Sequence, residues 1–126
     1  MDRKYLIAAL LYAVTGMCYG IYMAASKDHS FHPAHAHILL VGFVTSFIYA
    51  VIHKLWISAA NAKLAMTQFG LHHIGTVLMG TGLTLLFAGT YPEASLGPLL
   101  GISSIVVLVA MVLMLVMCSQ SSKSTS

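Results

Sequence analysis

Four long apolar stretches, separated by short polar connections, constrain the fold of this chain more than any other feature. They cover approximately residues 5–25, 35–57, 69–89 and 96–118. A helix needs about 20 apolar residues to cross the hydrocarbon core of a bilayer. Its backbone groups are then all satisfied internally, as lipid requires. The sequence therefore predicts an all-α, integral membrane four-helix bundle formed by residues 1–118, followed by a disordered serine-rich tail over residues 119–126.

The charged residues are few and unevenly placed. They make up 7% of the chain, whereas a soluble domain carries about 25%. On the predicted topology, one side of the bilayer carries most of the basic residues, namely Arg3, Lys4, Lys54, Lys63 and Lys123. The other side carries Lys27, Asp28 and Glu93. By the positive-inside rule, both termini are expected in the cytoplasm. The net charge of +3 is accounted for by this orientation, and no nucleic-acid partner is expected.

The missing motifs exclude several enzyme classes. The four apolar stretches contain no Asp or Glu, so a carboxylate proton relay is not expected. No Ser/His/Asp triad, phosphate-binding glycine loop or paired-carboxylate site is apparent. Hydrolytic activity is therefore not expected.

Histidine is the chemically informative residue type, and its seven copies form two groups. The outer group lies in the first loop and at the start of the second helix: His29, His32, His35 and His37. The inner group lies near the opposite membrane surface: His53, His72 and His73. Because His35 and His53 are separated by about 27 Å along a helix, one haem or metal ion cannot bind both groups within one chain.

His35 and His37 are expected to face in different directions. Two residues apart on a helix, they are about 200° apart around its axis. The stripe containing His35 is small and polar, continuing through Leu39, Gly42, Ser46, Tyr49 and His53. The stripe containing His37 is apolar, continuing through Val41, Val44 and Ile48. We therefore expect His35 to be an inward-facing ligand and His37 to contact a second subunit.

Small and hydroxyl-bearing residues line the other helices beside the histidines. The first helix offers Tyr12, Thr15, Tyr19 and Tyr22, and the third aligns His73 with Thr76, Gly80 and Thr84. Neutral imidazole is the commonest metal ligand, and a glycine leaves room for a flat porphyrin. The candidate cofactor-binding residues are His35, His37, His72, His73, Met23 and Gly42. Alternatively, the outer residues His29, His32 and His35 could bind copper or zinc. His29, His53 and one of His72 and His73 are also consistent with simple interfacial residues.

One segment resembles a known family. The stretch Pro33-Ala34-His35-Ala36-His37-Ile38-Leu39-Leu40-Val41-Gly42-Phe43 is similar to the second transmembrane helix of haem-copper oxidase catalytic subunits, in the cytochrome oxidase and nitric-oxide reductase branches. The segment Phe69–Gly75 also looks like the start of the following helix in small relatives of that family. The histidine of this helix is an axial ligand of low-spin haem b in the family. The resemblance implies that role for His35 first and for His37 second.

This resemblance also has a clear limit. The family's catalytic subunit has many more helices, and its second axial histidine and its copper ligands lie on helices that this chain lacks. A complete haem-copper centre, and hence oxygen or nitric-oxide reduction, is not implied. What the resemblance implies is a small haem b protein of a bacterial cytoplasmic (inner) membrane, used for electron transfer or for binding or sensing a diatomic gas.

Two further expectations concern partners. A homodimer could supply the second axial ligand, because most homo-oligomers have two-fold symmetry. An electron carrier would exchange electrons with a quinone or a redox protein. Two alternatives stay open, namely a copper- or zinc-binding or oxidase-assembly accessory protein, and a structural accessory subunit.

Overall fold

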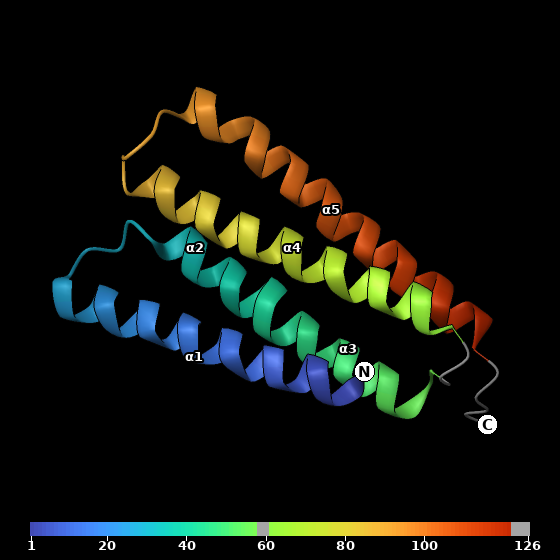
Figure 1. The fold of residues 1–126 in the computed structure, drawn as a ribbon. Coiled ribbons are helices and arrows are strands. Elements are labelled where there is room, and N and C mark those ends of the chain that lie inside the picture. Colours follow the sequence, from blue (N-terminus) through green and yellow to red (C-terminus); the bar gives the residue numbers. More distant parts are fainter. Residues whose placement is uncertain (58–60, 122–126) are drawn as a thin grey trace.

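The computed structural model describes residues 1–57 and 61–121, and every regular element in those residues is a helix (Figure 1). The elements are α1 (Asp2–Ser26), α2 (His32–His37), the π-helix η1 (Ile38–Val44), α3 (Thr45–Leu55), α4 (Ala62–Phe87) and α5 (Glu93–Gln120). Because α2, η1 and α3 run on continuously, they form one span, His32–Leu55. Four helices are thus long and apolar enough to cross a membrane. The predicted all-helical architecture with four spans is confirmed.

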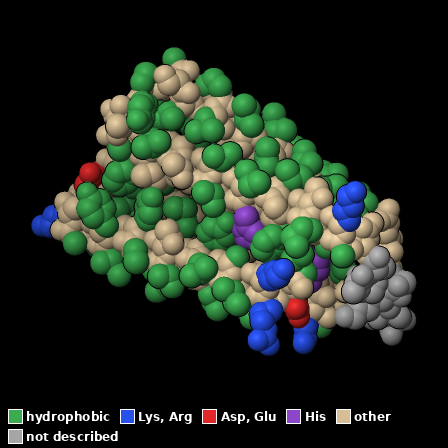
Figure 2. Space-filling model, viewed as in Figure 1, with side chains coloured by type: hydrophobic (Ala, Val, Ile, Leu, Met, Phe, Trp, Pro, Cys, Tyr) green, Lys and Arg blue, Asp and Glu red, His purple; other side chains and the backbone are tan. Residues whose placement is uncertain are grey.

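The outer surface of the bundle is apolar along most of its length. Figure 2 shows hydrophobic side chains covering the visible face, with charged side chains near the two ends. Large residues such as Ile21, Leu115 and Leu11 are 69%, 67% and 63% exposed. In water this much exposed apolar surface would cause aggregation. In a bilayer it is the surface that contacts lipid.

The start of α4 differs most from the sequence expectation, and the other helix boundaries differ by three residues or fewer. Helix α4 begins at Ala62, well before residue 69, because the Asn61 side chain accepts a hydrogen bond from the Leu64 backbone N–H at 3.0 Å. This N-cap starts about two helical turns, residues 62–68, that include the polar residues Lys63 and Gln68, which a hydropathy criterion assigns to a loop. At the other end, α5 continues through Gln120, so the first two residues of the predicted tail are helical. Residues 122–126 lie outside the described residues.

The helices pack as two hairpins. Helix α1 packs against η1 and α3, and α4 packs along α5, the most extensive contact in the molecule. Small residues permit these close approaches. A Cβ added at Gly16 would lie 2.4 Å from Leu39 Cδ2, and one at Gly75 would lie 2.7 Å from Val107 Cγ2. Gly16 and Gly75 therefore serve packing within the chain, as is common for small residues of helices in lipid.

The π-helix η1 keeps the second span's polar stripe facing the bundle. Thr45 Oγ1 donates a hydrogen bond to the carbonyl of Leu40, five residues earlier, at 2.8 Å. Buried positions recur every fourth residue through this segment: Ala34, Ile38, Gly42 and Ser46. That spacing fits the wider turn of a π-helix. Of the stripe predicted from His35 to His53, the part from Gly42 onward is buried, whereas His35 and Leu39 are partly buried.

The main apolar cluster lies at the end of the bundle where both chain termini are found (Figure 1). Its buried members are Tyr5, Tyr49, Ala50 and Met114. Partly buried side chains from the chain start, α3, α4 and α5 surround them, including Met1, Phe69 and Cys118. The inner histidines His53, His72 and His73 lie at this same end, next to the cluster.

Candidate functional site

Helix α1 carries three tyrosines on one face, and each bonds to α4. They are spaced seven residues apart, which is close to two helical turns. Tyr5 Oη donates to Gln68 Oε1. Tyr12 Oη is 2.8 Å from His73 Nδ1, and Tyr19 Oη is 2.8 Å from Thr84 Oγ1. We call this set the tyrosine ladder: Tyr5, Tyr12 and Tyr19 of α1 with Gln68, His73 and Thr84 of α4.

The ladder is the principal link between α1 and α4. Their backbones are not among the element pairs that pack closely, so long side chains bridge the gap between them. Gln68 is fully buried and its Nε2 also donates to the Ala110 carbonyl at 3.1 Å, which extends the network to α5. A buried amide with both ends bonded satisfies the requirement for polar groups away from water.

The ring of Tyr5 lies among the three inner histidines. Its centroid is 5.7 Å from His53, 5.8 Å from His72 and 5.3 Å from His73. His72 is fully buried, and its Nε2 lies 2.8 Å from Ser46 Oγ. Three buried ring nitrogens have no hydrogen-bond partner in the described structure: His53 Nε2, His72 Nδ1 and His73 Nε2. Unpaired buried polar atoms are uncommon, so this inner cluster is chemically unusual.

Among the outer histidines, His35 is held by a specific hydrogen bond. Its Nδ1 lies 2.8 Å from the carbonyl oxygen of Gly16 on α1. Because a carbonyl can only accept, Nδ1 carries a proton and donates it, and in the neutral imidazole the lone pair is then on Nε2. His35 is half-buried against α1, with Gly20 beside its ring. Metal-binding histidines are typically oriented by such a bond from the other ring nitrogen.

His37 points away from the bundle. It is exposed, and its Nδ1 lies 2.8 Å from the Pro33 carbonyl of its own helix. The predicted division between an inward His35 and an outward His37 is therefore what the structure has. His29 and His32 are also exposed, with the His32 ring centroid 6.3 Å from that of His35.

The first loop carries one acidic group beside these outer histidines. The hydroxyl and the backbone N–H of Ser30 donate to Asp28 Oδ1 at 2.5 Å and 3.0 Å. These hydrogen bonds, with the side-chain bond the larger effect, lower the pKa of Asp28 below its ordinary value. Asp28 therefore remains an anion next to His29 at neutral pH.

The structure forms only part of the ligand sets and of the space that the sequence predicted for a metal ion or a porphyrin. Within residues 1–57 and 61–121, no three His, Cys, Asp or Glu side chains are placed to hold one metal ion. A Cβ added at Gly42 would lie 2.7 Å from the Tyr12 ring, so the space expected there for a porphyrin holds a tyrosine. Met23 is buried in α1.

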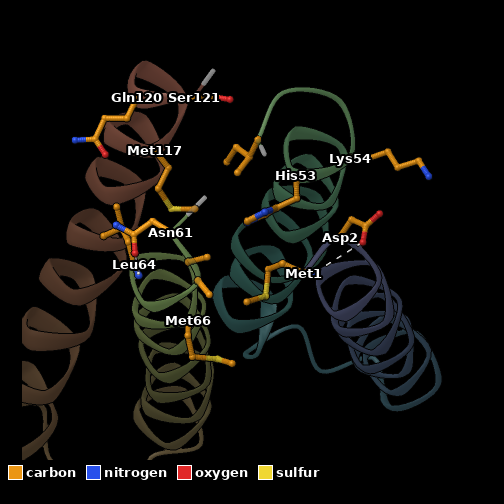
Figure 3. Close-up of a pocket in the computed structure, with 13 residues that line it drawn as sticks. Met1, Asp2, His53, Lys54, Asn61, Leu64, Met66, Met117, Gln120 and Ser121 are labelled. Atoms are coloured by element: carbon orange, nitrogen blue, oxygen red, sulfur yellow. Dashed lines mark hydrogen bonds and ion pairs between the residues drawn. The ribbon is translucent and has the colours of Figure 1, made fainter. Parts of the chain in front are cut away.

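Two hollows accompany these groups. A cavity of about 750 Å³ at the end near the termini is lined by His53, Asn61 and Met66 among others, and Figure 3 shows His53 extending into the space between the two hairpins. A groove of about 330 Å³ lies between α1 and α4. Its hydroxyl-bearing residues are Tyr12, Thr15, Tyr19, Thr76, Thr81 and Thr84. His35 lines neither hollow.

Sequence reasoning anticipated part of this arrangement. The sequence identified a face of Tyr12, Thr15 and Tyr19 on α1 and, separately, a face of His73, Thr76 and Thr84 on α4, without predicting that they meet. The groove brings the α1 face together with Thr76 and Thr84. Sequence reasoning missed Tyr5 and Gln68, which lie near the helix ends. Their signal was the seven-residue spacing of Tyr5, Tyr12 and Tyr19. Tyr22, which was grouped with them, is 54% exposed instead.

Comparisons with protein-family models, curated proteins and solved structures give no match. The resemblance to haem-copper oxidase subunits around His35 and in Phe69–Gly75 therefore stays a prediction from the sequence.

Proposed function

We propose that this chain is a small multi-pass membrane protein that binds haem b and uses it for electron transfer or for binding a diatomic gas. The observation that carries the proposal is the orientation of His35. With its Nδ1 proton donated to the Gly16 carbonyl, its Nε2 is the free nitrogen that an iron ligand requires. The imidazole belongs to a helix that is long and apolar enough to span a membrane, and ionisable residues in such helices are usually functional.

The residues present fit the ligand but leave little room for the ring inside one chain. Leu39 and Tyr12 fill the spaces beside Gly16 and Gly42. A porphyrin would therefore lie on the side of His35 that faces away from α1, where the residue is only half-buried. We propose that a second copy of the chain covers that side, giving a homodimer with His35 as an axial ligand and His37 near the contact. The bound haem would supply one-electron exchange or gas binding at its iron.

The proposed location is a bacterial cytoplasmic membrane with both termini inside. The support is the distribution of basic residues, since Arg3, Lys4, Lys54 and Lys63 share one end and Lys27 lies at the other. In this orientation, His35 lies toward the outer surface.

The test is a reduced-minus-oxidised visible spectrum of the purified protein, with haem quantified as its pyridine complex. We expect a b-type signal at about one haem per two chains if the site is shared between copies. His35→Ala should lose most of the haem because the iron loses its ligand. His29→Ala, an exposed histidine in the neighbouring loop, is the matched control and should keep it. Full haem occupancy in His35→Ala would refute the ligand assignment.

A further inference from the structure

The groove between α1 and α4 has an unusual lining for a surface at membrane depth. It lies within the apolar spans Asp2–Ser26 and Ala62–Phe87. Six of its residues carry hydroxyl groups, and its lining includes no Asp, Glu, Lys or Arg. Val77 on its edge is 53% exposed, so the groove is reached from the lipid-facing side. A ligand suited to it is therefore neutral and lipid-soluble.

The hydrogen bonds within the groove determine which of its hydroxyl groups can still donate to, or accept from, a ligand. Thr15 and Thr76 donate to the carbonyls of Leu11 and His72, at 2.9 Å and 2.6 Å. Thr84 donates to the Gly80 carbonyl at 2.7 Å. Because the Thr84 hydroxyl donates to Gly80, it accepts from the Tyr19 hydroxyl, so the Tyr19 proton is not available to a ligand. A hydroxyl oxygen has two lone pairs, so the threonine oxygens can still accept.

One hydroxyl is free of these bonds. In the described part of the chain, Thr81 is exposed and no hydrogen bond involves its side chain. The groove thus offers several acceptors and one uncommitted hydroxyl. Such a surface favours a molecule that donates hydrogen bonds over one that can only accept them.

The dimensions favour a single ring. The α1 side of the groove runs from Tyr12 to Tyr19, which are about 10.5 Å apart along the helix axis. A volume of about 330 Å³ is at the lower end of the range for small-molecule sites. Gly80 and Ile38 form part of the wall, and a Cβ added at Gly80 would make ordinary van der Waals contact with Ile38 Cγ1, at 3.4 Å.

We propose that the α1–α4 groove binds the ring of a neutral, lipid-soluble phenol or hydroquinone through hydroxyl groups that the ligand donates. The proposal concerns binding only and does not depend on the haem. A colourless protein that binds a hydroquinone would refute the haem proposal alone. A haem protein that binds none would refute the groove proposal alone.

A hydroquinone and its quinone are the sharpest probes, because they differ only in having O–H groups or carbonyls on the same ring. The full-length protein in lipid nanodiscs is titrated by calorimetry under reducing conditions with a short-chain alkyl hydroquinone, and separately with the matching quinone under air. We expect the hydroquinone to bind at least tenfold more tightly, which corresponds to about 1.4 kcal/mol. Equal affinity, tighter binding of the quinone, or no binding of the hydroquinone to the folded protein would overturn the proposal.

Thr81→Val locates the site, since it removes one hydroxyl at nearly constant shape on an exposed part of α4. It should weaken hydroquinone binding by about three- to tenfold, the effect of one hydrogen bond. Thr67→Val is the matched control, because Thr67 is an exposed α4 threonine outside the groove. Unchanged binding in Thr81→Val, or an equal loss in Thr67→Val, would place the ligand elsewhere. If either variant fails to fold, cross-linking of an azido-hydroquinone to α1 and α4 peptides decides the same question.

Discussion

At the scale of single residues, His35 depends on the small size of its neighbour. Gly20 lies next to the imidazole, and a Cβ added there would come within 3.2 Å of His35 Cε1. That distance is tighter than an ordinary van der Waals contact, so the ring would have to shift. The Gly16 carbonyl that orients the same imidazole lies one helical turn away in α1. Two backbone features of α1 therefore determine where the His35 ring sits.

Gly20→Ala tests this dependence. We expect the added methyl group to displace the ring, weaken the bond to Gly16 and lower haem occupancy, measured as the pyridine complex per chain. Gly101→Ala is the matched control, because no atom lies within 4 Å of a Cβ added there. The interpretation fails if the two variants retain the same amount of haem.

At the scale of helices, capping explains both the start of α4 and the error in predicting it. The sequence stretch before Phe69 is too polar for a membrane span by hydropathy, yet Asn61 begins a helix there. An N-cap side chain satisfies a backbone N–H that would otherwise have no partner in the first turn. The cap matters for the site because it brings Gln68 and His72 into a continuous helix with the groove residues.

Replacing the cap should therefore destabilise the fold without touching any proposed ligand. We expect Asn61→Ala to lower the free energy of unfolding by about 1 kcal/mol. The measurement is an unfolding titration in mixed detergent micelles. Asn61→Asp keeps an acceptor at the N-cap and should stay close to the parent protein. A similar loss of stability in both variants would show that the N-cap hydrogen bond does not account for the effect of Asn61→Ala.

Sequence reasoning succeeded for local features and failed for long-range ones. The apolar runs predicted four spans, and the period of the second span predicted which way His35 and His37 face, because both depend on neighbours along one helix. The Tyr5–Gln68 bond joins residues 63 positions apart, so it depends on how the helices pack. Similarly, the porphyrin space expected at Gly42 is filled by Tyr12 of another helix. The π-helix escaped prediction since its residues are ordinary apolar ones.

At the scale of the whole molecule, both termini lie at the end that carries the inner cluster (Figure 1). An even number of spans requires this arrangement, but it does not say which side of the membrane that end occupies. Arg3, Lys4, Lys54 and Lys63 are all exposed or lie at the surface of that end. Positive charge of this kind favours the cytoplasm.

Reporter fusions check the orientation directly. Alkaline phosphatase fused after the last residue should be inactive in bacterial cells, because it folds only outside the cytoplasm. Fused after Ser30, in the loop between α1 and α2, it should be active. The reverse pattern would place the termini and the inner histidines outside, and the outer histidines inside.

The tyrosine ladder has a consequence for how the protein is made. Chains are synthesised from the N-terminus, so α1 is complete before any residue of α4 exists. Until the third span is synthesised, the hydroxyls of these tyrosines therefore lack their α4 hydrogen-bond partners, Gln68, His73 and Thr84. Because the second span packs on α1 through its own contacts, the first hairpin can form early and leave one polar face unfinished. We therefore expect the tyrosine ladder to form only when α4 packs beside α1, as a step separate from the entry of α1 into the membrane.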